Sequence, residues 1–512
     1  MSKSSCQQED SIHQDESLCR PISPVPLSEP PYSIFDARQR ALIVAIVSIA
    51  ATFSGFASNI YFPALPMIAK DLGVSVELTN LTVTSYLIFQ GIAPSLWGPV
   101  SDVQGRRVAY FFTFIVFLAA CVGLALARSY AALLVLRCLQ SAGSASTIAI
   151  GSGVIGDITT RSNRGGIMGI FQAGLLAPVA VGPVIGGVLA GSLGWHSIFW
   201  FLTIYGGCYL ICLLLLLPET LRSVVGNGSI KSSNFFQKFP LSVYQRTTRT
   251  EFQTIHCAIA TKNKIDVFGP FYILASKQAI SIILFLAIYY TVWQMSITAM
   301  STLFQNYYGL GEIQIGLTFI ANGVGSIVGT LVTGKILNIE YSRVNAAHKR
   351  RVAELPAVAD GEYRNETSMD KEMDFPIEKA RLRLIPVFSV LQCLSILLFG
   401  WTVHFPRRVH IAVPIVSTFF TGWTAVSAQS IVMTYLVDVF HDRSAAAGAS
   451  LNLARCLLAA GGTSLIMPMI NSIGVGPAFS VCAAVQATAT VLIGIQWKYG
   501  GRWRIEAHKN ME

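Results

Sequence analysis

The chain has 512 residues, of which 53% are hydrophobic and only 12% are charged, and its formal net charge is +10. This composition excludes an ordinary soluble multidomain protein and favours an integral membrane protein. The sequence contains neither the phosphate-binding loop of ATP-driven pumps nor a metal-ligand spacing of cysteine and histidine. We therefore expect no enzyme activity, no cofactor and no metal site.

Runs without Asp, Glu, Lys or Arg predict the membrane-spanning helices, because a bilayer core about 30 Å thick needs roughly 20 apolar residues per helix. In chain order these runs are 41–69, 78–101, 108–127, 138–156, 165–218, 278–311, 313–334, 384–406, 409–437 and 456–497. Two runs are too long for one helix, and we expect them to break at 191–196 and 474–477, where glycine and proline supply turns. Twelve transmembrane helices result, in an all-α integral membrane fold.

Polar stretches divide these helices into two sets of six. We expect a disordered cytoplasmic N-terminal arm, a first six-helix half, a cytoplasmic central loop, a second six-helix half and a cytoplasmic tail, at 1–40, 41–217, 218–276, 277–497 and 498–512. A further polar stretch at 339–383 is dense in charge and predicts a long mobile loop within the second half.

The two halves also echo each other in sequence. Asp157 and Arg161 follow helix 4, and Asp438 and Arg443 follow helix 10, which are equivalent positions in a six-plus-six arrangement. Repeats of this kind pack pseudo-symmetrically around a central cavity.

Basic residues set the orientation, because Lys and Arg are retained on the cytoplasmic side during insertion. With the N-terminus inside, most of the 37 Lys and Arg fall on inner segments, and the outer loops hold only Lys70, Arg128, Arg407 and Arg408. Both termini are therefore expected in the cytoplasm, and the positive charge reflects topology rather than nucleic-acid binding. We expect the plasma membrane as the location, although no residue distinguishes it from the vacuolar membrane.

A short loop between helices 2 and 3 carries the most informative motif. Its residues Gly98, Asp102, Gly105, Arg106 and Arg107 form the pattern Gly-x-x-x-Asp-x-x-Gly-Arg-Arg, which resembles the corresponding loop of the major facilitator superfamily of secondary transporters. A carboxylate at the inner end of helix 2 can pair with a guanidinium or cap a neighbouring helix, and such a contact can favour one transporter conformation. The alternative is a set of ordinary interfacial charges.

Helix 4 is expected to carry a buried cation. Placing Arg137 at this depth costs about 2.5–3.5 kcal/mol on insertion scales, so it should face the protein interior or a water-filled cavity. Together with Gln140 and Gly143 it resembles the family's helix-4 motif, which implies a role for the arginine in proton coupling. The alternative is an arginine whose side chain extends to the outer surface.

Glycines and prolines in helix 5 resemble the antiporter motif of the same superfamily, which implies export rather than import. Small residues let helices approach closely, and proline permits a bend at a gate. Plain helix packing without gating is the alternative. The residues concerned are Gly169, Gly182, Pro183, Gly186 and Gly187.

A second deep cation, Arg455, lies in helix 11 one turn after Asn452. Arg137 and Arg455 belong to different halves and can face one cavity, which suits an anionic substrate; a purely structural Arg455 is the alternative. No Asp, Glu or His lies in the middle of a predicted span, so proton coupling rests on the resemblance, with Asp157 and Asp438 as the nearest titratable groups. Further candidates for the cavity lining are Asn59, Tyr61, Tyr290, Trp293, Gln294 and Gln429.

The resemblance spans nearly the whole chain, including 58–66, 218–220 and 435–438. The chain looks like the fungal branch of the 12-spanning drug:proton antiporters, a group that also contains exporters of citrate and related carboxylates. This resemblance implies a monomer in the lipid bilayer that exports a drug, toxin or secondary metabolite by alternating access, in exchange for protons. Export of organic anions such as citrate is one alternative, and a nutrient-sensing transceptor is another.

Overall fold

The computed structural model describes residues 33–159, 161–227, 269–354, 377–440 and 444–509, and the regular structure in these residues is helical. The first half contains α1 (Ala37–Asn59), η1 (Phe62–Ala64), α2 (Leu65–Asp71), α3 (Val76–Gln104), α4 (Arg106–Ala125), α5 (Tyr130–Ile158), α6 (Arg161–Leu193), α7 (His196–Leu216) and the short α8 (Arg222–Val225). The second half contains α10 (Gly269–Ala275), α11 (Ile280–Tyr308), α12 (Glu312–Glu354), α14 (Ile377–Leu382), α15 (Ile385–His404), α16 (Ala412–Val439), α17 (Ser444–Ile473), α18 (Val475–Ala489) and α19 (Val491–Lys509).

These helices cross the bundle twelve times, as predicted. Both expected breaks are confirmed, since Gly194 separates α6 from α7 and Gly474 separates α17 from α18, with φ of 82° and 88°. Such positive φ values are accessible to glycine at little cost, which explains why each apolar run turns there. Within the described ranges, ten helical segments have the length and mean hydropathy of a membrane span. The crossings α3 and α16 are more polar, with Thr, Ser, Asn and Gln along their lengths.

Helix continues beyond the hydrophobic runs in two polar segments. The loop predicted from 339 is wrong over 339–354, because α12 continues without a break to Glu354. Helix-forming Ala, Lys, Arg and Glu dominate this stretch, so helix propensity persists after the hydrophobic run ends. An ion pair at i, i+3 between Glu340 and Arg343 adds local support. Likewise, α19 extends to Lys509 through most of the segment expected as a tail.

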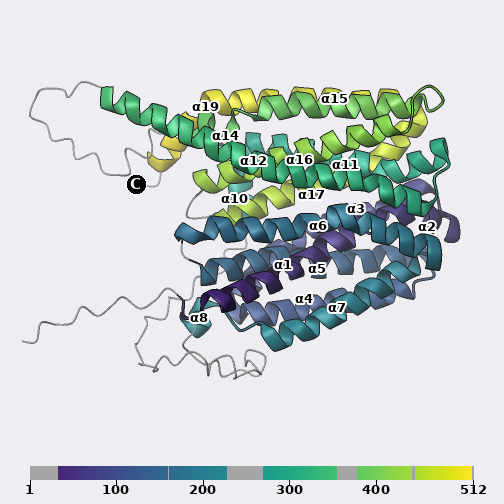
Figure 1. The fold of residues 1–512 in the computed structure, drawn as a ribbon, viewed down its shortest axis with the longest axis horizontal. Helices are drawn as coiled ribbons and strands as arrows, with labels where there is room; N and C mark the ends of the chain where they lie inside the picture. Colours follow the sequence, from purple (N-terminus) through teal and green to yellow (C-terminus); the bar gives the residue numbers. More distant parts are fainter. Residues whose placement is uncertain (1–32, 160, 228–268, 355–376, 441–443, 510–512) are drawn as a thin grey trace, which may run out of the picture.

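The two halves lie side by side, with α6 packed along α12 and α3 packed along α17 (Figure 1). We call the end of the bundle at the α3–α4 turn, on the left of Figure 1, the basic end, and the end at α2 the far end. Toward the far end, Thr84 is hydrogen-bonded to Thr463 and Ser464 at 3.1 and 2.8 Å, and Asn471 donates to Glu77 at 2.6 Å. These contacts close the bundle between α3 and α17 at the far end.

The halves diverge toward the basic end. Gly91 and Gly98 are seven residues apart and therefore lie on nearly the same face of α3. A Cβ atom at Gly91 would lie 3.1 Å from Cys456 Cβ in the other half, whereas one at Gly98 would meet no atom within 4 Å. Helix α3 is thus in close contact with α17 at Gly91 and meets no described atom at the Gly98 position, two turns nearer the basic end.

Glycine makes the far-end contact between α6 and α12 possible. A Cβ atom at Gly187 would lie 2.5 Å from the carbonyl oxygen of Glu312, and one at Gly316 would lie 2.5 Å from that of Pro183. Both distances are too short for a side chain, so the two backbones approach as closely as glycine allows.

Replacing Gly187 with Val is therefore expected to separate the halves at the far end and to lower transport about tenfold or more. Spin labels at Leu78 and Ile473, in a background without native cysteines, would report the distance between α3 and α17. The matched control is Gly207→Val, because a Cβ atom at Gly207 meets nothing within 4 Å. An unchanged distance in Gly187→Val would contradict the role of this contact.

Candidate functional site

A sharp turn at the basic end brings the charged loop residues together. Gly105 has φ 112° and ψ 148°, and it separates the last residue of α3 from Arg106, the first residue of α4. This backbone conformation favours glycine, so the motif's second glycine has a structural reason. As a result, Asp102 on the last turn of α3 lies beside the Arg106 side chain.

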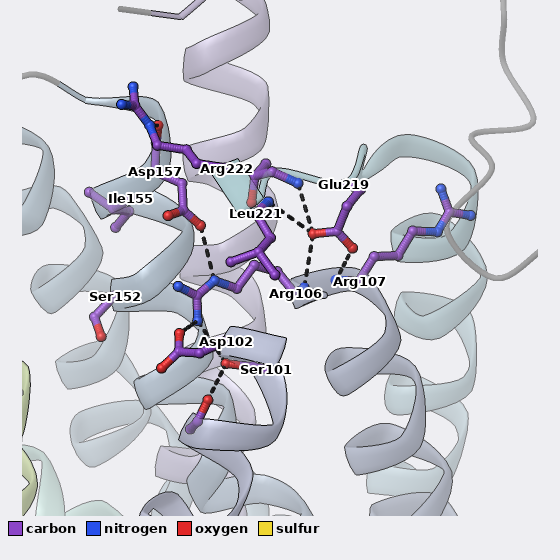
Figure 2. A network of polar contacts seen from close by, with 12 residues as sticks. Ser101, Asp102, Arg106, Arg107, Ser152, Ile155, Asp157, Glu219, Leu221 and Arg222 are labelled. Atoms are coloured by element: carbon purple, nitrogen blue, oxygen red, sulfur yellow. Dashed lines mark hydrogen bonds and ion pairs between the residues drawn. The ribbon is translucent and has the colours of Figure 1, made fainter. Parts of the chain in front are cut away.

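Arg106 is the centre of the polar network in Figure 2. Its guanidinium forms ion pairs with Asp102 and with Asp157 at the end of α5, the latter with Nε 3.0 Å from Oδ2, and it donates to Ser101 Oγ at 2.7 Å. The side chains of Arg106 and Asp157 are 9% and 13% exposed. Gly153 on α5 leaves room for this guanidinium, since a Cβ atom there would lie 2.7 Å from Arg106 Cζ. The network therefore joins α3, α4 and α5 through one buried cation.

Glu219 caps the start of α4. Its carboxylate accepts from the backbone nitrogens of Arg106 and Arg107 at 2.9 and 3.2 Å, and also from those of Thr220 and Leu221 (Figure 2). A helix start leaves its first N–H groups unpaired and carries partial positive charge, so a buried carboxylate is stabilised there. Sequence reasoning did not single out Glu219 as a site residue. The available signal was that α4 begins after a glycine, which has no side chain to cap it.

Arg107 has a different role from Arg106. Its guanidinium donates to the carbonyl oxygens of Leu217 and Leu214 at 3.0 and 2.5 Å, which are carbonyls at the end of α7. Arg222 donates from Nε to the backbone oxygen of Asp157 at 3.0 Å. Cations near the last carbonyls of a helix are favourable, so these two arginines fasten helix ends together.

The second half has a counterpart to the Arg106–Asp157 pair. Arg381, just before α15, pairs with Asp438 at the end of α16, with Nε 2.7 Å from Oδ2, and lies over the Tyr341 ring. Nearby, Arg383 pairs with Glu340 at 3.3 Å. This repetition confirms that Asp157 and Asp438 occupy equivalent positions. Sequence reasoning missed Arg381, because the long insertion before it hides its correspondence to Arg106.

Three further motif residues are described little or not at all. Arg161 begins α6 and Gly169 lies within that helix, whereas Arg443 lies outside the described residues. Their expected part in gating stays a prediction.

Arg137 lies in the interior of the first half, toward the far end of α5. The residue is 1% exposed, so it does not extend to the outer surface. Nη1 donates to Gln140 Oε1 at 2.6 Å and to the Ala57 carbonyl at 3.0 Å, and the guanidinium lies 4.2 and 4.4 Å from the ring centroids of Tyr61 and Tyr86. Two aromatic faces and two neutral acceptors thus hold this cation.

Arg455 forms a similar cluster in the second half, but a half-buried one. Its guanidinium donates to Asn452 Oδ1 at 2.9 Å and to Gln429 Oε1 at 2.9 Å, and it lies 4.8 Å from the Tyr290 ring centroid. Within the described part of the chain, we find an ion pair to a carboxylate for neither Arg455 nor Arg137. Both deep cations therefore rely on neutral partners.

Helix α3 connects the two arginine clusters. Tyr86 packs against Arg137. One turn later on α3, the backbone carbonyl of Gln90 accepts a hydrogen bond from Asn452 Nδ2 at 3.0 Å. Because Asn452 also holds Arg455, the two cations are linked across the boundary between the halves.

The other predicted lining residues are placed less uniformly. Asn59 donates to the Gly55 carbonyl of its own helix at 2.8 Å, and Gln294 is buried. Trp293 is buried and donates from Nε1 to Asn322 Oδ1 at 3.1 Å, and its ring packs edge-on against Tyr290.

The glycines of the fifth predicted span, which is α6 in the structure, lie at close contacts between helices. A Cβ atom at Gly182 would meet Asn59 and Ile60 of α1 at about the van der Waals limit, and one at Gly186 would overlap the Ile60 carbonyl. Gly187 and Pro183 contact α12 as described above. The expectation of close packing is confirmed for these positions, and their part in gating stays a prediction.

Comparison with known proteins assigns this architecture. The sequence model of the Major Facilitator Superfamily matches residues 47–463. The chain belongs to this superfamily. It is therefore a multi-pass membrane transporter and not an enzyme.

Two similar relatives and one solved structure agree with the assignment. Citrate exporter 1 of Aspergillus niger is 38% identical over 480 residues, which cover 93% of this chain and 89% of that protein. MFS antiporter QDR2 of Candida albicans is 35% identical over 456 residues, covering 89% and 88%. The structure of the xylose transporter XylE from E. coli superposes with a TM-score of 0.61 at 14% identity, covering 90% of this chain and 98% of XylE, and supports the fold alone.

Replacing Arg106 with Gln is expected to lower the free energy of unfolding by about 3 kcal/mol, because it leaves the buried Asp157 carboxylate without its cation. Thermal unfolding of the purified protein would measure the change. Arg343→Gln is the matched control, since that side chain is 70% exposed and its ion pair should contribute little. Equal effects of the two substitutions would show that the Arg106 network is not structural.

Glu219→Gln offers an independent test of the helix cap. The substitution removes the negative charge and turns one acceptor oxygen into a donor facing backbone N–H groups. A loss of about 2 kcal/mol in unfolding free energy is expected, measured by the same thermal unfolding. Wild-type stability in this variant would contradict the capping role.

Proposed function

We propose that the protein exports a small organic anion of the carboxylate class from the cytoplasm by alternating access, in exchange for protons. One observation carries the proposal. The half-buried Arg455 guanidinium is held by Asn452, Gln429 and Tyr290, which are all neutral. A cation at membrane depth is costly unless something neutralises it, and an anionic solute can do so when it binds.

Arg137 strengthens the positive potential of the site from the other half. The cation–π contacts with Tyr61 and Tyr86 stabilise the guanidinium without removing its charge. Tyr86 and Gln90 on α3 lie between the two arginine clusters, because Tyr86 packs against Arg137 and the Gln90 backbone carbonyl accepts from Asn452. Anion binding next to Arg455 is therefore supported by both halves.

The direction and the coupling follow from different evidence. Lys and Arg retained at the basic end favour a cytoplasmic basic end, so the conformation closed at the far end would load solute from the cytoplasm. The relatives include a protein named as a citrate exporter and another named as an antiporter. In our proposal, solute export is exchanged for proton entry, and Asp157 and Asp438 at the basic end are the acidic side chains that the coupling would use.

A second candidate is export of an uncharged or cationic drug, with the same fold and the same coupling. The aromatic wall formed by Tyr290 and Trp293 favours it, because aromatic surfaces accept varied apolar solutes. The plasma membrane and a monomeric state are the setting that we propose for either substrate class.

Arg455→Gln separates the two candidates. Export of labelled citrate from preloaded cells is expected to fall about tenfold or more, because a charge-assisted contact is lost, whereas efflux of a cationic dye should be unaffected. Arg407→Gln is the control, since that arginine is exposed at the far end. Unchanged citrate export together with impaired dye efflux would favour the drug exporter.

Proton coupling has its own test. A protonophore is expected to abolish concentrative export while leaving exchange of labelled for unlabelled solute intact. Export that ignores the proton gradient would refute the coupling, and would leave the anion site itself untouched.

A further inference from the structure

Asn322 on α12 is a buried amide with only one end in use. The residue is 2% exposed, and its Oδ1 accepts from Trp293 Nε1 at 3.1 Å. Among the described residues, its Nδ2 has no hydrogen-bond partner. A buried donor left unpaired is destabilising, so it calls for an explanation.

The indole of Trp293 fixes which way the amide faces. An indole N–H can only donate, so the oxygen of Asn322 must face Trp293 and the NH₂ group must face away from it. The backbone of α16 keeps close to the amide, because a Cβ atom at Gly422 would lie 2.6 Å from Asn322 Oδ1. The chain therefore orients the NH₂ donors away from Trp293, and the α16 backbone at Gly422 packs against the oxygen side of the amide.

The same aromatic wall leads from this amide to Arg455. Arg455 lies over Tyr290, the Tyr290 and Trp293 rings meet edge-on with centroids 5.5 Å apart, and Trp293 holds Asn322. Along α11, Trp293 lies one turn nearer the far end than Tyr290. Arg455 and Tyr290 are half-buried, whereas Trp293 and Asn322 are buried. A solute that enters from the basic end would thus meet Arg455 first and the amide at the closed end.

We propose that Asn322 Nδ2 donates to a second acceptor group of the solute whose carboxylate binds Arg455. This inference rests on the proposed anion transport and adds to it a rule for specificity. Solutes with a second carboxylate or hydroxyl can bind the Arg455 guanidinium with one group and Asn322 Nδ2 with the other. Those with one carboxylate and an apolar tail leave the amide unpaired, and a site with such a buried polar group rejects them.

Glutarate and valerate test this rule, because they share a five-carbon skeleton and differ in the second carboxylate. The measurement is the concentration that gives half-maximal thermal stabilisation of the full-length purified protein in lipid nanodiscs, with citrate as a third probe. Wild type is expected to prefer glutarate and citrate over valerate. Asn322→Leu should raise the half-maximal concentration of glutarate and citrate about tenfold and lower that of valerate, because no unpaired amide then opposes the apolar tail.

Two other variants complete the design. Trp293→Phe removes the indole donor that orients the amide, and should raise the glutarate value by a smaller factor without affecting valerate. Asn306→Leu is the matched control, because Asn306 is exposed near the end of α11. If Asn322→Leu does not fold, Asn322→Ser removes the same amide with less bulk and is judged by the same ratio.

The outcomes separate this inference from the proposed function. Wild type that binds the probes, and loses all three in Arg455→Gln, supports the anion site. If that result is obtained but the Asn322 variant weakens the binding of all three probes equally, or of none, the second contact is overturned and the anion site is not. Wild type that binds none of the three probes overturns the carboxylate proposal and the Asn322 contact with it.

Discussion

A cation inside a membrane bundle must find its partners within the protein, and this constraint organises the structure. At the basic end the solution is ionic, since Arg106 and Arg381 each reach a carboxylate at the end of a neighbouring helix. At depth the solution is neutral, because amide oxygens, a carbonyl and aromatic faces surround Arg137 and Arg455. The first arrangement fastens helix ends together. The second holds a positive charge that has no carboxylate partner among the described residues.

The contacts between the two halves are of a different kind from these ion pairs. Polar contacts between α3 and α17 and glycine contacts between α6 and α12 hold the halves together toward the far end. The hydrogen bonds found across this boundary among the described residues are uncharged apart from the one to Glu77, so separating them does not strand a buried charge. The ion pairs found in the described residues lie within each half and keep it rigid. Alternating access requires halves that are rigid inside and that can separate at the contact between them.

Much of this arrangement could be predicted from sequence, because charge-free runs and glycine turns are local signals. The breaks at Gly194 and Gly474 and the interior position of Arg137 follow from hydropathy and from the cost of a buried charge. Helix α12 was harder, because hydropathy marks where a membrane ends and not where a helix ends, and Lys- and Arg-rich sequence continues the helix to Glu354. Partnerships were harder still. Neither the four backbone donors of Glu219 nor the pairing of Arg381 with Asp438 is visible without knowing which helix ends are adjacent.

The unbroken α12 has a mechanical consequence. Its 43 residues make a rod about 65 Å long, and it leaves the far-end contact at Glu312 and projects past the rest of the bundle at the other end (Figure 1). Any rotation of the second half about that contact displaces each point of the rod in proportion to its distance from the pivot. The tip near Glu354 is therefore a lever arm that turns a small tilt at the membrane into a large sweep beyond it.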